Sequence, residues 1–120
     1  DAEKAGLKVQ TVKTSYEAYD FGKGRWDLLA MILSWAPVEE PDFLGRLKAS
    51  IRPGGYLVFE HVLQRAEDPF PPGVHAPAPG ALRELFRDFE ILTYREEDHP
   101  GDWGGPPTPH VWMVARKGAA

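Results

Sequence analysis

Two apolar runs flank a segment with helical spacing, and this arrangement constrains the fold more than any other feature. Residues Trp26 to Leu33 are continuously apolar after Asp27, as in a strand that is covered on both faces of a parallel sheet. Val38 to Ile51 places apolar residues at helical intervals, and "RPGG" stops it. "YLVFEHVL", Tyr56 to Leu63, is then predicted as the next strand. Strand, helix and strand in this order form a right-handed βαβ unit, so the fold class is α/β.

The rest of the sequence adds shorter elements and two loops. Gln64 to Gly80 is rich in proline and cannot be regular structure. The last two predicted strands follow one another without a helix between them, which predicts an antiparallel hairpin joined by a long excursion. The further predicted elements are a helix end closed by Gly6, a strand at Leu7 to Val12, a helix at Ala81 to Phe89, and strands at Glu90 to Glu97 and His110 to Lys117.

Composition excludes several classes of function. A chain of 120 residues has room for one domain, residues 1–120, with a modest core. The net charge of −4 argues against a nucleic-acid backbone or an anionic membrane as partner. No cysteine is present, which excludes disulfides and thiolate sites and is compatible with the cytoplasm. We expect no membrane span and no signal peptide. The chain begins at Asp1, which hints at a piece of a longer protein.

The runs "WDLLAMILSWAP" and "LKASIRPGGYLVFEH" resemble the second half of class I S-adenosylmethionine-dependent methyltransferases. In that family an aspartate followed by apolar residues forms the fourth strand, a helix ends in "L(K/R)PGG", and the fifth strand has the form "LVxE". A helix, a sixth strand and an antiparallel seventh strand complete the sheet. The resemblance extends from about Lys8 to the end of the chain. It implies a partial Rossmann-like sheet with a carboxyl-terminal antiparallel hairpin.

Two parts of the family pattern are missing from this sequence. The family's glycine-rich loop cradles the methionine part of the cofactor, and an acidic residue after its second strand binds the ribose. The glycine pairs here, Gly54-Gly55 and Gly104-Gly105, do not lie between a strand and a helix. The chain therefore resembles strands three to seven only. We expect S-adenosylmethionine to bind this fragment weakly or not at all.

The resemblance assigns residues to the cofactor side of the site. By alignment, Ser15 stands where the family commonly has an aspartate that contacts adenine, and a serine is a weaker acceptor. Leu33 and Ser34 follow the predicted fourth strand, and Trp35 next to them suits a flat or cationic ligand. Trp35 is equally well read as a core aromatic that caps the sheet. The predicted cofactor-binding residues are Ser15, Tyr16, Leu33, Ser34 and Trp35.

The acceptor side is predicted from the end of the next strand. Ligands bind outside the carboxyl ends of parallel strands, so we expect Glu60 and His61 at the mouth of the site. His61 is the candidate catalytic residue, because an imidazole can orient an acceptor or take its proton. Glu60 and Trp103 are the candidate substrate-binding residues, with the loops Gln64 to Gly80 and Asp98 to Pro109 facing the acceptor. The alternatives are a strand end bonded to neighbouring loops, and a Trp103 that anchors its own loop.

A metal site and a serine triad are not predicted. The four histidines lack helical i, i+4 spacing, and no serine occupies a nucleophile elbow. The leading hypothesis is methyl transfer to an unknown small molecule. The alternatives are a non-catalytic half-domain that binds a ligand or partner, and a different metal-free activity in the vacated cleft. Without strands one and two, the Trp26 to Leu33 strand would have an open apolar edge. We therefore expect a homodimer, formed by edge pairing or by exchange of a segment such as Leu7 to Val12.

Overall fold

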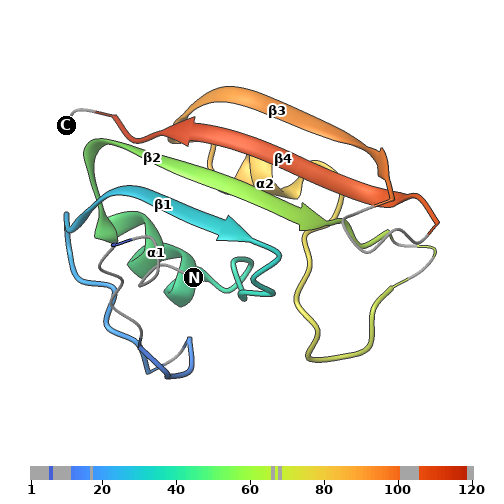
Figure 1. The fold of residues 1–120 in the computed structure, drawn as a ribbon, viewed down its shortest axis with the longest axis horizontal. Coiled ribbons are helices and arrows are strands. Elements are labelled where there is room, and N and C mark those ends of the chain that lie inside the picture. The colour runs from blue at the N-terminus through green and yellow to red at the C-terminus, as the bar shows by residue number, and fades with distance from the viewer. Residues whose placement is uncertain are drawn as a thin grey trace.

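The structure is a computed structural model that describes residues 6, 12–16, 18–65, 67, 69–100 and 106–118. Within these residues, four strands form one sheet in the order β1-β2-β4-β3 (Figure 1). β1 (Trp26–Ile32) is parallel to β2 (Ile51–Val62). β4 (Thr108–Arg116) is antiparallel to β2 and to β3 (Glu90–His99). The predicted α/β fold, with a parallel part and a carboxyl-terminal antiparallel hairpin, is confirmed.

Helix α1 (Pro41–Ser50) connects the two parallel strands. Pro41 favours the start of the helix because the first turn needs no N–H from it, and the helix ends where Ile51 becomes extended. β2 begins earlier than predicted, at Ile51, so the "RPGG" segment lies within its bounds. The register shifts there: Trp26 pairs with Ile51, whereas Leu28 pairs with Tyr56. This irregularity absorbs the turn between the helix and the regular part of β2.

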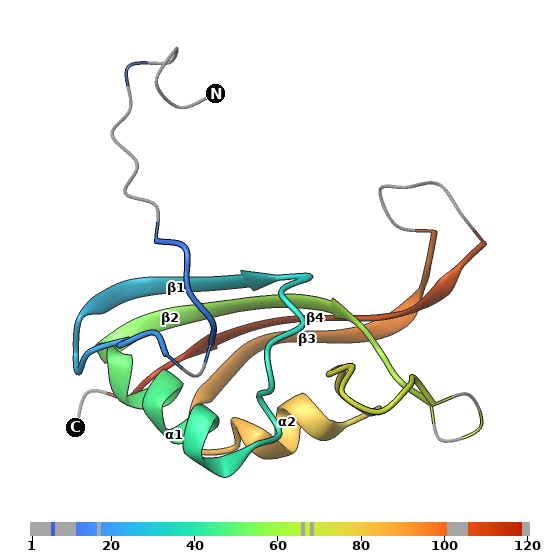
Figure 2. The same ribbon diagram turned by 90° about the horizontal axis from the view of Figure 1, so that it is seen from below.

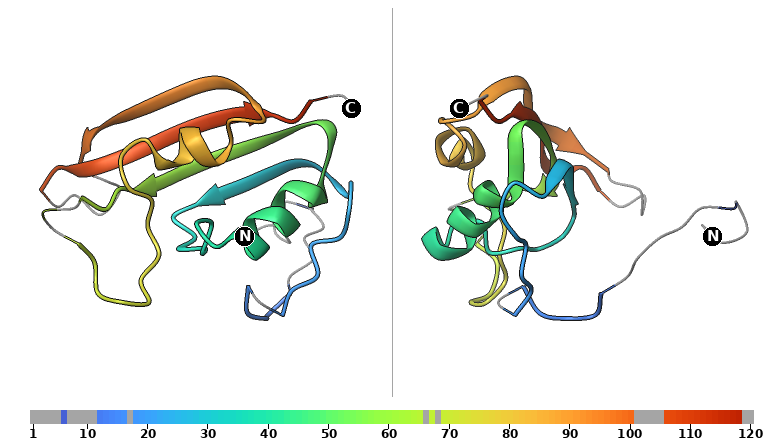
Figure 3. Two further views of the ribbon diagram at one scale, coloured as in Figure 1. Left: turned by 180° about the vertical axis from the view of Figure 1, so that it is seen from behind. Right: turned by 90° about the vertical axis from the view of Figure 1, so that its left-hand side faces the viewer.

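Both helices lie on the same face of the sheet (Figures 2 and 3). α2 (Ala81–Leu85) is shorter than the predicted Ala81 to Phe89, because Phe86 leaves the helical conformation. The core forms between this face and the helices, and its members include Met31, Leu47, Phe59, Leu82, Phe86, Val111 and Met113. No helix in the described part of the chain is long and apolar enough to cross a membrane.

The other face of the sheet carries exposed apolar side chains. Leu28 is 58% exposed, Ile32 is 56% exposed and Tyr56 is 41% exposed. Among the described residues, β2 is the one strand that pairs with β1, so the outer edge of β1 is open. The predicted strand Leu7 to Val12 lies outside the described residues except for Val12, which belongs to no strand.

Candidate functional site

The carboxyl ends of the parallel strands β1 and β2 lie side by side. Ile32, the last residue of β1, pairs with Glu60 near the end of β2. The N–H of Leu33 then donates to the carbonyl oxygen of Glu60 across 2.8 Å, which extends the pairing by one residue. This is the edge at which open α/β sheets bind ligands. The turn after β1 and the end of β2, which hold the predicted site residues, therefore lie next to each other.

The turn after β1, Leu33-Ser34-Trp35, has an unusual backbone. Leu33 has a φ of 50° and Trp35 a φ of 55°, so two bulky residues stand in the left-handed region. Each such conformation costs about 1–3 kcal/mol and persists where the surroundings impose it. The expected strand Trp26 to Leu33 accordingly ends one residue early, at Ile32.

Three hydrogen bonds hold this turn in place. Besides the bond from Leu33, the N–H of Trp35 donates to Nε2 of His61 across 3.2 Å, and the hydroxyl of Tyr16 donates to the carbonyl oxygen of Ser34. The ring of Tyr16 also packs edge-on against Phe43 of α1, with 5.8 Å between ring centroids. The turn is thus held from β2 and from the segment that precedes β1.

His61 is buried, with 1% of its surface exposed. Its Nδ1 lies 2.9 Å from the carbonyl oxygen of Val62, and its Nε2 accepts from Trp35. Burial lowers the pKa of His61 below its ordinary value of 6.5; the bond to Val62 raises it and the charge of His110 lowers it further. The neutral ring with the proton on Nδ1 satisfies both bonds. Because both nitrogens are occupied, His61 orients the turn, and its predicted role in proton transfer stays a prediction.

An apolar cavity of about 360 Å³ opens beside Trp35. Trp35 stands 4.4 Å from the ring of His61 and 5.9 Å from the ring of Phe70, with both contacts edge-on. Trp35 is 42% exposed, so it forms a wall of the cavity and is not a fully covered core residue. The lining comes from the turn after β1, the end of β2, the loop after β2 and the start of β4, with the residues Trp35, Val62, Leu63, Arg65, Glu67, Phe70, Thr108 and Pro109.

The other predicted residues are placed differently. Glu60 and His61 are neighbours in a strand, so their side chains point to opposite faces of the sheet. Glu60 faces the side away from the helices, opposite Trp112 of β4, and does not line the cavity. Ser15 is exposed, and its hydroxyl accepts a bond of 3.1 Å from the N–H of Ala18. Trp103 lies outside the described residues.

Sequence reasoning named the loop Gln64 to Gly80 but missed Phe70 within it. The side chain of Gln64 accepts a hydrogen bond from the N–H of Phe70, which fixes the loop against the end of β2. A single phenylalanine among prolines is a weak signal. Phe70 contacts Trp35, which follows β1 rather than β2. This long-range contact could not be predicted from the sequence pattern.

Ser34, which the resemblance assigns to the cofactor side, stands in the turn after β1. The hydroxyl of Ser34 is buried and has no hydrogen-bond partner among the described residues. The glycine-rich loop and the ribose-binding acid of the resembled family are not in the sequence. The resemblance assigns Ser34 to the adenine side of S-adenosylmethionine, and the sequence has no residues for its methionine side. No three histidine, aspartate or glutamate side chains gather as metal ligands in the described chain.

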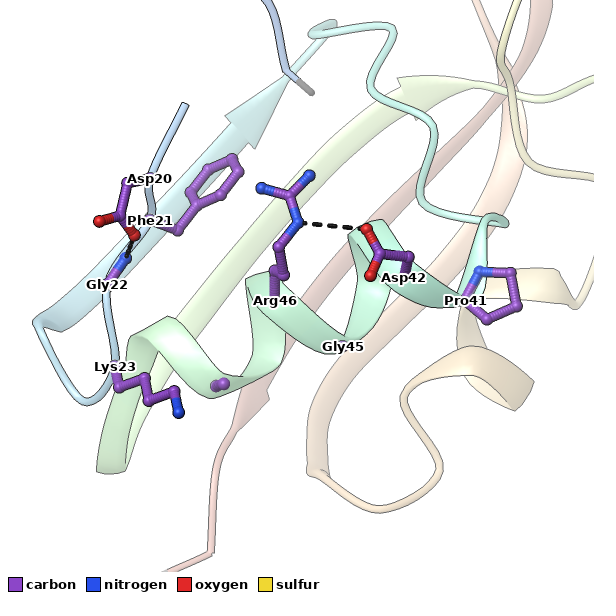
Figure 4. A pocket seen from close by; sticks show the side chains of 9 residues that line it. Asp20, Phe21, Gly22, Lys23, Pro41, Asp42, Gly45 and Arg46 are labelled. Atoms are coloured by element: carbon purple, nitrogen blue, oxygen red, sulfur yellow. Dashed lines mark hydrogen bonds and ion pairs between the residues drawn. The ribbon is translucent and has the colours of Figure 1, made fainter. Parts of the chain in front are cut away.

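A second depression, of about 660 Å³, lies between α1 and residues 20–23 (Figure 4). Arg46 reaches into it from α1, but its guanidinium donates to the carbonyl oxygens of Tyr19 and Tyr16 at 3.0 and 3.3 Å. Its Nε also lies 3.4 Å from a carboxylate oxygen of Asp42. Arg46 thus anchors the segment before β1, and its charge is taken up by these partners.

No protein-family model and no curated protein matches this chain, but solved structures do. TehB from Haemophilus influenzae is 24% identical, with a TM-score of 0.75 over 96% of this chain and 43% of TehB. A 1,6-didemethyltoxoflavin-N1-methyltransferase from Burkholderia thailandensis, with S-adenosylhomocysteine bound, is 23% identical, with a TM-score of 0.60 over 98% and 54%. The [4+2]-cyclase SpnF is 20% identical, with a TM-score of 0.72 over 99% and 60%.

The chain spans about half the length of these structures, 43% to 60%. Sequence identity at this level establishes the fold and leaves the reaction open, as the cyclase and the N1-methyltransferase illustrate. The sheet order, the "RPGG" segment and the turn after β1 all agree with the resemblance seen in the sequence. The chain therefore has part of the fold of the class I S-adenosylmethionine-dependent methyltransferases.

Proposed function

We propose that this chain takes part in the transfer of a methyl group from S-adenosylmethionine to a small molecule, and that it forms the acceptor side of the site. The observation that carries the proposal is the strained turn Leu33-Ser34-Trp35. It stands at the carboxyl ends of two parallel strands, is held by three hydrogen bonds, and borders an apolar cavity. Backbone strain that the surroundings maintain is typical of functional sites.

Methyl transfer asks little acid-base chemistry of the protein. S-Adenosylmethionine, when bound, supplies a sulfonium methyl that is already reactive, so the protein mainly orients the acceptor. In this proposal Trp35 and Phe70 hold the acceptor. His61 is a positioning residue, because its Nε2 accepts from the backbone of Trp35. Ser34, with its unpartnered hydroxyl, and Tyr16, with its bond to Ser34, border the adenine side.

We also propose that the chain forms a homodimer. The outer edge of β1 is unpaired among the described residues, and Leu28 and Ile32 beside it are exposed. Open apolar edges recruit another strand, and antiparallel pairing of two β1 strands about a twofold axis would close both edges. Residues 1–120 would then act as one domain of a cytoplasmic protein, in keeping with the single core and the absence of cysteine.

Two measurements test the proposed function. The reading frame upstream of Asp1 is sequenced first, and we expect a strand followed by a Gly-x-Gly loop. S-Adenosylhomocysteine is then titrated by calorimetry into the 120-residue chain and into the form extended by that upstream segment. We expect binding by the extended form and weak or no binding by the chain alone. A start codon directly before Asp1, or no binding by the extended form, would overturn the proposal.

Transfer itself is tested with S-adenosylmethionine labelled in its methyl group. The extended protein is incubated with a panel of small molecules, and the labelled products are separated. Trp35→Leu should lower the transfer rate, whereas Tyr56→Leu, which removes an exposed aromatic ring on the opposite face of the sheet, should leave it unchanged. Equal loss of transfer in the two variants would contradict the assignment of the cavity as the acceptor site.

A further inference from the structure

The cavity beside Trp35 has aromatic walls set at an angle. The rings of Trp35 and Phe70 are inclined by 68° with 5.9 Å between their centroids, so they form a corner. A flat ring placed in this corner can lie parallel to one wall and present its edge to the other, which is the geometry that aromatic pairs prefer. The volume of about 360 Å³ is at the small end of ligand cavities. It suits a compound of one or two fused rings.

The charges on the lining are unbalanced toward the negative. Arg65 lines the cavity, but its guanidinium lies 3.0 Å from a carboxylate oxygen of Asp98, which neutralises it. Glu67 also lines the cavity, is exposed, and forms no ion pair with another described residue. An aromatic corner beside a carboxylate without a cation is complementary to a positively charged ligand, because ring faces and carboxylates both attract cations.

We propose that this cavity binds a flat aromatic cation of one or two fused rings, with its rings in the corner formed by Trp35 and Phe70 and its charge toward Glu67. This rests on the proposed function, of which it names the acceptor class: a planar nitrogen heterocycle that carries its charge on one nitrogen and, on another atom, a free lone pair that takes the methyl group. Binding itself requires no cofactor and no transfer. It can therefore be measured on the 120-residue chain alone.

Three probes of similar size separate planarity from charge. 4-Aminoquinoline is planar and cationic at neutral pH, 2-naphthol is planar and neutral, and decahydroquinoline is cationic but not planar. Calorimetric titration at fixed ionic strength should rank their affinities in that order, with 4-aminoquinoline at least about tenfold tighter than decahydroquinoline. Equal affinities, or tighter binding of the saturated amine, would overturn the proposal.

Variants test whether the probes bind in the cavity. Glu67→Gln should weaken 4-aminoquinoline severalfold and leave 2-naphthol unchanged, whereas Phe70→Leu should weaken both. Tyr56→Leu and Glu40→Gln are matched controls, since both side chains are exposed and neither lines the cavity. Circular dichroism confirms that each variant is folded. Loss of binding in the controls, or an unchanged affinity in both cavity variants, would contradict the site.

Nuclear magnetic resonance gives an independent location. The chain has four tryptophans, and Trp35→Leu assigns one of their indole N–H signals. 4-Aminoquinoline should shift that signal and leave the signal of Trp112 in place. Probe binding without methyl transfer would keep this inference and reject the proposed function. Methyl transfer by the extended protein, with no shift of the Trp35 indole signal on addition of 4-aminoquinoline, would keep the proposed function and reject this inference.

Discussion

The backbone N–H of Trp35 donates a hydrogen bond to Nε2 of His61, across 3.2 Å. The bond joins the turn after β1 to the buried end of β2 and requires that Nε2 carry no proton. Nδ1 then carries the proton and donates to the carbonyl oxygen of Val62 at 2.9 Å. A second proton on the ring would make Nε2 a donor that faces the N–H of Trp35, which is also a donor. Protonation of His61 and the observed turn therefore exclude each other.

Stability should therefore fall as the pH is lowered. The pKa of His61 is lowered in the folded chain by burial, opposed by its bond to Val62 and assisted by the charge of His110. As the pH falls, His61 therefore takes up a proton in the unfolded chain first, near its ordinary pKa of 6.5. The contribution of His61 is complete above that pH. It declines, by at most about 1.4 kcal/mol per pH unit, until the folded pKa is reached.

The measurement is urea unfolding between pH 7.5 and 4.5, for the wild type and for His61→Gln. Glutamine keeps an oxygen near the position of Nε2 but does not titrate in this range, so the difference between the two free energies of unfolding isolates His61. We expect that difference to shrink as the pH falls. A constant difference across the range would show that the ring of His61 is not held neutral.

Removing the hydrogen-bond acceptor at position 61 should lower the free energy of unfolding more than replacing it with another acceptor does. His61→Leu leaves the N–H of Trp35 and the carbonyl oxygen of Val62 without their partner. An unsatisfied buried polar group costs about 1–3 kcal/mol, so at pH 7.5 His61→Leu should be less stable than His61→Gln by about that amount. Equal stabilities would mean that the hydrogen bond to Trp35 does not hold the turn.

Gly55 should not tolerate a side chain. A Cβ atom at this position would lie 2.8 Å from Cγ2 of Ile51, 2.9 Å from the carbonyl oxygen of Arg52 and 3.0 Å from that of Asp27. Two of these atoms are backbone, so Gly55→Ala should destabilise the fold by about 1–3 kcal/mol in urea unfolding.

The matched control for Gly55 is Gly45 in α1. A Cβ atom there meets nothing within 4 Å, and alanine is the better helix former by about 1 kcal/mol. Gly45→Ala should therefore be neutral or stabilising. If Gly45→Ala destabilised the fold, the space next to Gly45 on α1 would not be open. If Gly55→Ala were tolerated, the close packing of the "RPGG" segment would be contradicted.

The homodimer is tested by light scattering at low micromolar concentration. We expect twice the chain mass of 13.4 kDa. Leu28→Lys with Ile32→Lys should shift the mass toward the monomer, because like charges would face each other across the paired edges. Leu92→Lys, on an exposed leucine of β3, is the control and should leave the dimer intact. A monomer in the wild type would defeat the edge argument.

The order of elements was open to prediction because it rests on local pattern. The apolar run after Asp27, the helical spacing after Pro37 and the "RPGG" stop each reflect interactions between residues close in sequence. For the helices and strands that the structure describes, the prediction and the structure differ at the ends of the elements. β1 ends before Leu33, since hydrogen bonds from distant residues impose a left-handed turn there, and α2 ends at Leu85.

The sequence by itself therefore determined the α/β class, the two parallel strands and the position of His61 at the end of one of them. The tertiary structure alone decided that β4 lies between β2 and β3. It also decided that Trp35 meets Phe70 across a cavity. The alternation of side chains along β2 was implicit in the sequence, but only packing decided that His61 faces the helices and Glu60 does not. Local periodicity specifies a strand, whereas long-range burial chooses its neighbours and its inner face.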